Sequence, residues 1–155
     1  MISISFSLDN SAILEVAKLE LFYLGEELKD SVDNPEIAAN IQAGSDKDDI
    51  FKHYLNAEES ILSGVFSDLS SVRLGDNPSV DALVPDTFDM NQIGTISEAF
   101  KYYLAYQVIS RWLQVTFPDK AQYYLALATD KRKEINNRLI RRTKPIVRPV
   151  LPLGF

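Results

Sequence analysis

The chain has 155 residues, enough for one domain, and its apolar share of 46% is ample for a packed core. It contains no cysteine, which excludes a disulfide framework, thiolate metal sites and a cysteine nucleophile. The net charge of −6 combines −13 over residues 1–130 (8 Lys/Arg, 21 Asp/Glu) with +7 over residues 131–148 (8 Lys/Arg, 1 Glu). Such polarity favours head-to-tail contact between copies, or docking of the basic end on an acidic protein or a nucleic acid.

The first 29 residues predict a strand followed by a helix. Residues 2–8 alternate apolar with small polar side chains, the period of a short strand or extended arm. Asp9 and Asn10 can cap a helix, and apolar residues spaced by three and four predict that helix over 11–29. We expect its core face to hold Ile13, Val16, Ala17, Leu21, Leu24 and Leu28.

A second helix is predicted after a connection over residues 30–45, which can hold one helical turn at 36–42. Three aspartates follow Ser45 within four residues, and they place anions at the positive end of a helix dipole. The expected apolar face of this helix consists of Ile50, Phe51, Tyr54, Leu55, Ala57, Ile61, Leu62, Val65 and Phe66.

The periodicity is lost over residues 70–94, where glycine and proline recur. A stretch of about 20 residues without regular structure is unusual in a compact domain and indicates function or mobility. We expect this segment to be mostly irregular, with short β pieces around 80–84.

Two long helices are predicted for the remainder. Thr95 and Glu98 form a capping-box pattern, and the helix that they begin is apolar nearly all round to about residue 117. We therefore expect a central helix in which Trp112 is largely buried. Pro118 interrupts it, and a last helix over 120–142 gives either a helical hairpin or one kinked helix.

The predicted fold is mostly α: a small helical bundle of about four helices with a short N-terminal strand or arm, forming one domain over residues 1–143. Residues 144–155 are predicted to be an extended arm, because three prolines fix φ there and exclude a helix. Apolar residues between the prolines suit docking on a partner at little cost in ordering entropy. The partner-docking arm comprises Pro145, Ile146, Val147, Pro149, Val150, Leu151, Leu153 and Phe155. Disorder of this tail in the isolated protein is the alternative.

A basic segment precedes and enters the arm. It comprises Lys131, Arg132, Arg138, Arg141, Arg142, Lys144 and Arg148. These side chains are expected to face carboxylates of a partner protein or packaged DNA. The alternative is that they only complement the negative end of the last helix dipole.

The sequence offers no catalytic motif: neither a phosphate loop nor a nucleophile elbow nor a dinucleotide fingerprint occurs. Asp49 and His53 are spaced to share a helix face as a metal or acid–base pair, although an acidic helix start beside a surface histidine is the favoured interpretation. Glu58 and Glu59 point about 100° apart on a helix and do not share a site. We expect no enzyme activity, no cofactor and no metal.

Five tyrosines, at positions 102, 103, 106, 123 and 124, lie near the basic segment in the sequence. Base stacking is one interpretation, but their helical spacing with Leu and Ala favours core or interface positions. Residues 1–25 lack a basic start, and no apolar run approaches the ~20 residues that span a bilayer, so no membrane partner is expected.

The stretch HYLNAEESILSGVF, residues 53–66, resembles the first core helix of tailed-bacteriophage head–tail connector (adaptor) proteins. FKYYLAYQVISRWL and YYLALATDKRKEINNRLIRRTKP are similar to that family's second helical pair and its exit into an extended tail. The resemblance covers residues 46–148 at the level of pattern. Residues 2–29 and 70–94 have no counterpart in it, which leaves a different neck ring protein or a tail-completion protein open.

The resemblance implies a structural virion protein that forms a ring beneath the portal, matches the portal symmetry and extends the DNA channel. Its implied partners are further copies of itself, the portal protein, the tail or a second neck protein, and packaged DNA through non-specific contact. Its implied location is the virion neck, with the host cytoplasm during assembly. A cytosolic helical adaptor or regulator with a nucleic-acid-binding C-terminal segment is the alternative, and an enzyme with unrecognised carboxylate chemistry is the third.

Overall fold

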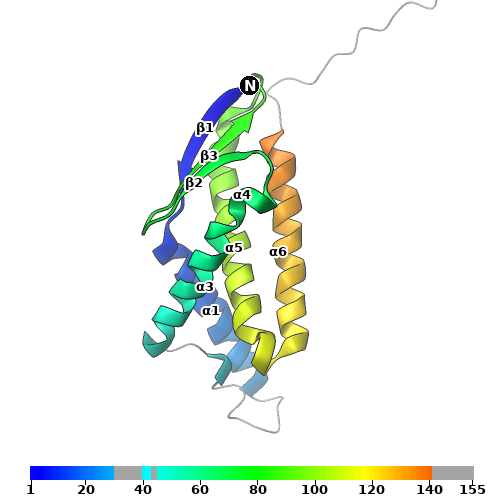
Figure 1. Cartoon of the computed structure of the whole chain (residues 1–155). Helices are drawn as coiled ribbons and strands as arrows, with labels where there is room; N and C mark the ends of the chain where they lie inside the picture. The colour runs from blue at the N-terminus through cyan, green and yellow to red at the C-terminus, as the bar shows by residue number, and fades with distance from the viewer. Residues whose placement is uncertain (30–39, 43–44, 141–155) are drawn as a thin grey trace, which may run out of the picture.

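The computed structural model describes residues 1–29, 40–42 and 45–140, which form a mostly helical molecule with a small sheet (Figure 1). In chain order the elements are β1 (Ile2–Ser7), α1 (Asn10–Lys29), η1 (Ser45–Lys47), α3 (Asp48–Ser60), α4 (Leu62–Val65), β2 (Leu69–Arg73), β3 (Ser79–Val84), η2 (Met90–Gln92), α5 (Ile93–Thr116) and α6 (Pro118–Leu139). The mostly α class is confirmed. The predicted arm over 144–155 lies outside the described residues.

The three strands form one antiparallel sheet in the order β1-β3-β2. Ile4 of β1 and Leu69 of β2 both lie opposite Ala82 of β3, and all three side chains are buried. Asp81 ties the strands together, because its carboxylate accepts hydrogen bonds from Ser5 Oγ (2.5 Å) and Ser71 Oγ (2.8 Å). These bonds lower the pKa of Asp81.

The prediction for residues 70–94 is corrected by this sheet. Strand β3 forms where β pieces are expected around 80–84, but β2 is a second strand that pairs with it. Leu83 N–H also donates to Asp68 O at 2.9 Å, so the chain before β2 is fastened to β3. Backbone hydrogen bonds to β3 hold β2 in the sheet, and the sequence pattern of β2 alone does not indicate this pairing.

Helix α5 is the central element, as its apolar surface predicts. Figure 1 shows it between α6 on one side and α3 on the other, and α1 and β1 also contact it. Phe100 is fully buried, with its ring centroid 5.3 Å from that of Phe6 and 4.9 Å from that of Phe66. Three aromatic rings therefore join β1, the end of α4 and α5 into one core.

Helices α5 and α6 form a hairpin rather than one kinked helix. Phe117, between them, has φ −148° and ψ 75°, outside the helical region, and Pro118 occupies the first turn of α6. Proline is tolerated there because its missing N–H would have had no helical partner.

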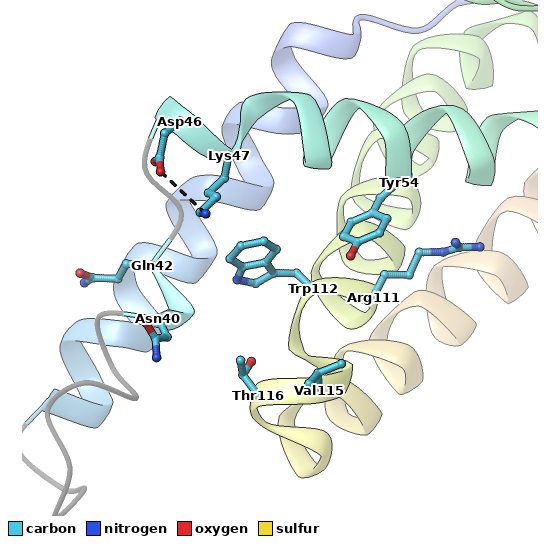
Figure 2. A pocket seen from close by; sticks show the side chains of 9 residues that line it. All are labelled: Asn40, Gln42, Asp46, Lys47, Tyr54, Arg111, Trp112, Val115 and Thr116. Carbon is cyan, nitrogen blue, oxygen red and sulfur yellow. Dashed lines mark ion pairs between the residues drawn. The ribbon is translucent and has the colours of Figure 1, made fainter.

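Trp112 is partly buried and packs against the core, in keeping with its expected placement. Its ring centroid lies 4.8 Å from that of Phe51, and its Nε1–H donates to Ile41 O at 2.9 Å. The indole lies near the end of α5, and the pocket beside it is lined by the 40–42 segment, η1 and Tyr54 of α3 (Figure 2).

The predicted face of the second helix is wrong at two positions. Ile61 interrupts the helix with φ −102° and ψ 1°, so α3 ends at Ser60 and α4 begins at Leu62. Ile61 is consequently 47% exposed, and Ile50 is 39% exposed. Glu58 and Glu59 are buried instead.

Candidate interaction surfaces

The basic C-terminal half of α6 is partly engaged within the fold. Lys131 Nζ lies 3.0 Å from Glu134 Oε2, and Arg138 Nε lies 3.1 Å from Glu134 Oε1. The hydrogen bond from Lys131 is the largest cause of a lowered pKa at Glu134, and Arg138 adds to it. Arg138 Nη1 also donates to Gln92 Oε1 at 2.7 Å, which fastens the end of α6 to η2. Arg132 is exposed and has no ion pair within the described ranges.

The structure thus brings three of the predicted basic residues together on α6 and leaves one of them, Arg132, fully available. The other four, Arg141, Arg142, Lys144 and Arg148, lie outside the described residues, as does the partner-docking arm. Lys133, which has no ion pair in the described part of the chain, is exposed next to Arg132.

The tyrosines divide into core and surface. Tyr103 and Tyr124 are buried, as helical spacing predicts, and burial raises the pKa of both. Tyr102 is half-buried between two lysines, with Lys101 Nζ 5.2 Å and Lys131 Nζ 5.6 Å from its ring centroid. These are cation–π distances. Between α5 and α6, the side chains of the two lysines therefore cover the aromatic surface of Tyr102.

Glu58 is a buried carboxylate with a cationic partner. Arg111 of α5 places Nε 2.5 Å from Glu58 Oε1, with the acid side chain 6% exposed and the base 41% exposed. A buried charge needs such a partner, because desolvation of an isolated ion is costly. The pair links α3 to α5.

Glu59 has no such partner. It is 1% exposed, and neither carboxylate oxygen has a hydrogen-bond partner of good geometry among the described residues. Burial raises the pKa of Glu59 to about 7, a rise that the neighbouring Asn10 side chain partly offsets. Asn10 Oδ1 is a buried acceptor that also lacks a donor, whereas Asn10 Nδ2 donates to Gly75 O at 3.0 Å.

The two glutamates therefore turn to different elements, α5 and α1, as their 100° separation predicts. Their burial could have been predicted from their spacing, since positions 58 and 59 follow the buried Phe51 by seven and eight residues. Carboxylates are seldom fully buried, which is why composition argues against that placement.

A pocket of about 540 Å³ opens beside Trp112. Figure 2 shows the indole facing the segment that carries Asn40 and Gln42, with Tyr54 on the adjoining wall. Lys47 and Asp46 form an ion pair of 3.8 Å at its rim. The nine lining residues include no histidine and no carboxylate pair.

The Asp49–His53 pair does not develop into a metal site. Within the described ranges, no three His, Cys, Asp or Glu side chains come together in a way that could hold a metal ion. In the same part of the chain, no helix has the length and apolarity needed to cross a membrane.

The outer face of α1 is apolar and acidic, a feature that the sequence prediction missed. Leu19, Phe22 and Tyr23 are 52%, 49% and 61% exposed, at a spacing of three and four residues. Glu15 and Glu26 lie on the same side and are exposed. The signal was a second apolar stripe beside the core stripe of the same helix.

Comparison with family models, curated proteins and solved structures found no match to this chain. A function therefore has to be inferred from the surfaces described above and from the pattern of the sequence.

Proposed function

We propose that this chain is a structural virion protein, a head–tail connector or neck ring subunit that bridges the portal and the tail and extends the DNA channel. It acts by oligomerisation and docking, without catalysis. Further copies of itself, the portal, and the tail or a second neck protein are its partners, and its basic segment faces the portal or the packaged DNA.

One observation carries this proposal: two different surfaces of opposite charge lie on separate helices. The outer face of α1 is acidic and apolar, whereas the C-terminal half of α6 exposes Arg132 and Lys133 and leads into further bases. Heterologous contact between two unlike surfaces closes into a ring when the rotation between copies allows it. The resemblance of residues 46–148 to connector proteins agrees with that mode of assembly.

The test is the mass of the protein in solution, measured by light scattering for the purified chain alone and with the portal protein from the same genome. We expect a complex in which many copies join one portal ring. A variant that ends at Lys144 should keep its helical circular dichroism and its melting temperature but fail to join, because it lacks the arm. A full-length chain that never associates with the portal would contradict the proposal.

One observation favours the alternative of a nucleic-acid-binding adaptor. Tyr102 and the exposed Tyr123 lie with lysines over their rings, and Lys120 Nζ is 5.3 Å from the Tyr123 centroid. Aromatic side chains among cations can stack on unpaired bases. However, Lys101 and Lys131 already pair with Glu98 and Glu134. Tight, salt-dependent binding of a single-stranded oligonucleotide that is lost in Tyr102→Ala would favour this alternative.

A further inference from the structure

Strand β1 forms one edge of the sheet, because the order β1-β3-β2 gives it β3 as its only neighbouring strand among the described residues (Figure 1). Its pairing with β3 is regular over all six residues, and Ile2–Ser7 contains neither a charged residue nor a proline. Natural edge strands are usually protected by such residues or by bulges, which prevent pairing with a further strand. The opposite edge, β2, is protected: its register shifts between Leu69 and Ser71, and it ends on Arg73.

The hydrogen bonds to β3 show which backbone groups of β1 point away from the sheet. Leu8 N–H donates to Pro78 O at 2.8 Å, and this pair continues the register of β1 with β3. In an antiparallel pair of strands, hydrogen-bonded positions alternate with positions whose backbone groups point outward. The backbone groups of the even-numbered residues of β1 therefore face β3, and those of Ser3, Ser5 and Ser7 face away from it.

Two of these outward positions, Ser3 and Ser5, have no hydrogen-bond partner for their backbone groups within the described ranges. Ser7 O accepts a hydrogen bond from Ser97 Oγ of α5 at 3.4 Å, so that end of the edge is already occupied. Unpaired backbone groups at a sheet edge recruit a further strand, and main-chain hydrogen bonds then supply the affinity. The chemistry of this edge therefore requires a strand as its partner.

A second copy of β1 meets the requirements of the edge on both faces of the sheet. When two copies lie antiparallel about a two-fold axis at Ile4, Ser3 of each copy lies opposite Ser5 of the other. Each such pair can exchange two backbone hydrogen bonds, and all four serines share the outer face. On the core face, Ile2 lies opposite Phe6 of the other copy, so pairing covers an apolar side chain that is 37% exposed in the single chain. Because β1 has no charged side chain, it can face itself without like-charge repulsion.

We propose that β1 pairs antiparallel with β1 of a second copy, which joins two three-stranded sheets into one continuous sheet. The contact closes at two copies, because each β1 edge is used once and the bulge in β2 protects the other edge. It involves neither the outer face of α1 nor the basic half of α6. The inference therefore goes beyond the proposed function, and either can fail without the other.

A proline at position 3 tests the outward hydrogen bonds. Ser3→Pro removes an N–H that points away from β3, and proline is tolerated on the solvent side of an edge strand. By light scattering, the parent alone should have twice the chain mass of 17.5 kDa. Ser3→Pro should weaken dimerisation about tenfold, because each of the two symmetric pairs loses a hydrogen bond. The matched control Ser3→Ala removes the same hydroxyl but keeps the N–H, so it should dimerise as the parent does.

Disulfide trapping tests the register and does not depend on a proline variant. The chain contains no cysteine, and the Cα atoms of a hydrogen-bonded antiparallel pair lie about 5.5 Å apart, a distance that a disulfide bridges. When Ser3→Cys and Ser5→Cys chains are mixed and mildly oxidised, they should form about tenfold more linked dimer than Ser3→Cys mixed with Ser63→Cys, since pairing raises the effective thiol concentration. Ser63 is exposed on α4 and is not part of the β1 edge.

The other outcomes decide against the proposal. A parent that is monomeric at every concentration would overturn it, as would equal cross-linking in the two mixtures. Dimerisation that Ser3→Pro leaves unchanged would place the contact elsewhere. A disulfide within one chain that carries Ser3→Cys and Val150→Cys would mean that residues 141–155, rather than a second copy, cover β1. If β1 does not pair but the portal complex forms, only this inference fails; if the dimer forms without portal binding, only the proposed function fails.

Discussion

At the residue scale, the buried carboxylates of α3 are the side chains whose burial is most costly to the stability of the fold. Glu58 has the Arg111 guanidinium beside it, whereas Glu59 has no cation and no well-placed donor within the described ranges. A buried carboxyl without a nearby cation or donor favours its uncharged form. When a cation is paired with it, the stability of the fold depends on that cation. The two positions therefore respond to different perturbations.

Removing Arg111 should destabilise the fold through Glu58. Loss of one partner from a buried ion pair costs about 3–5 kcal/mol, and solvent access to Arg111 lowers our expectation for Arg111→Ala to about 2–3 kcal/mol. Urea unfolding followed by circular dichroism measures this change. The double variant Glu58→Met, Arg111→Met should recover most of the loss, because it leaves no unpaired charge. A single variant as stable as the parent would show that the pair contributes nothing.

Stability should depend on pH through Glu59. Its folded-state pKa of about 7 lies above the ordinary value of 4.5, so the folded state binds more protons between these values. The free energy of unfolding therefore falls as pH rises from 4.5 to 7 and levels off above. Glu59→Gln lacks this loss, so its stability relative to the parent should increase by about 2–3 kcal/mol from about pH 5 to pH 8.

Urea unfolding at four pH values across that range gives the comparison for Glu59. Asp130→Asn, at an exposed position on α6, removes a carboxylate from water and is the control that should show no such trend. Parallel stability curves for the parent and Glu59→Gln would mean that the buried carboxyl is already satisfied when charged.

At the element scale, Trp112 attaches the 40–42 segment to α5. Trp112→Phe keeps a ring against Phe51 but removes the N–H donated to Ile41 O, which should cost about 1 kcal/mol. Amide hydrogen exchange at residues 40–42 should accelerate in this variant. Val115→Ala, at a 90% exposed position on the same helix, is the control and should change neither quantity. Unchanged exchange at 40–42 would mean that other contacts hold the segment.

The elements also show what sequence periodicity can and cannot predict. Helices α1, α5 and α6 have apolar repeats long enough to predict their type and approximate bounds, and the alternation of residues 2–8 predicts β1. Strand β2 escapes prediction because Leu69 is its only buried residue, and its stability comes from pairing with β3. Arg111, which pairs with Glu58, lies on α5, and Asn10, which lies beside Glu59, is on α1, so no local pattern reveals these neighbours.

At the scale of the whole molecule, the sequence predicts where the charged residues lie along the chain. It does not predict which of them are free to contact a partner. Half of the Lys and Arg residues fall within 131–148, but Lys131 and Arg138 are occupied by Glu134 and by Gln92. Arg132 is the base of the predicted set that the described fold leaves free on the surface. Such pairing depends on which turn of α6 faces η2, which composition alone does not specify.

Charge reversal at the free bases should therefore impair assembly without unfolding the subunit. The variant Arg132→Glu, Arg141→Glu, Arg142→Glu spares Arg138, whose reversal would place a carboxylate beside Glu134 and weaken α6 itself. We expect this variant to melt as the parent does but to form fewer oligomers or portal complexes by light scattering. Assembly of the parent should weaken with salt, since charge contacts at the surface are screened over ~8 Å at physiological ionic strength.

The matched control for this reversal makes the same change in net charge elsewhere, at Lys29, Lys52 and Lys120, for which no ion pair is found among the described residues, and should assemble normally. Its comparison with the Arg132, Arg141 and Arg142 variant separates a specific basic surface from the effect of total charge, which alone alters association through repulsion. If both variants assemble like the parent at low and at physiological salt, the bases only complement the negative end of the α6 dipole. Contact between copies must then come from apolar surface, and the exposed stripe of Leu19, Phe22 and Tyr23 is where that surface is found.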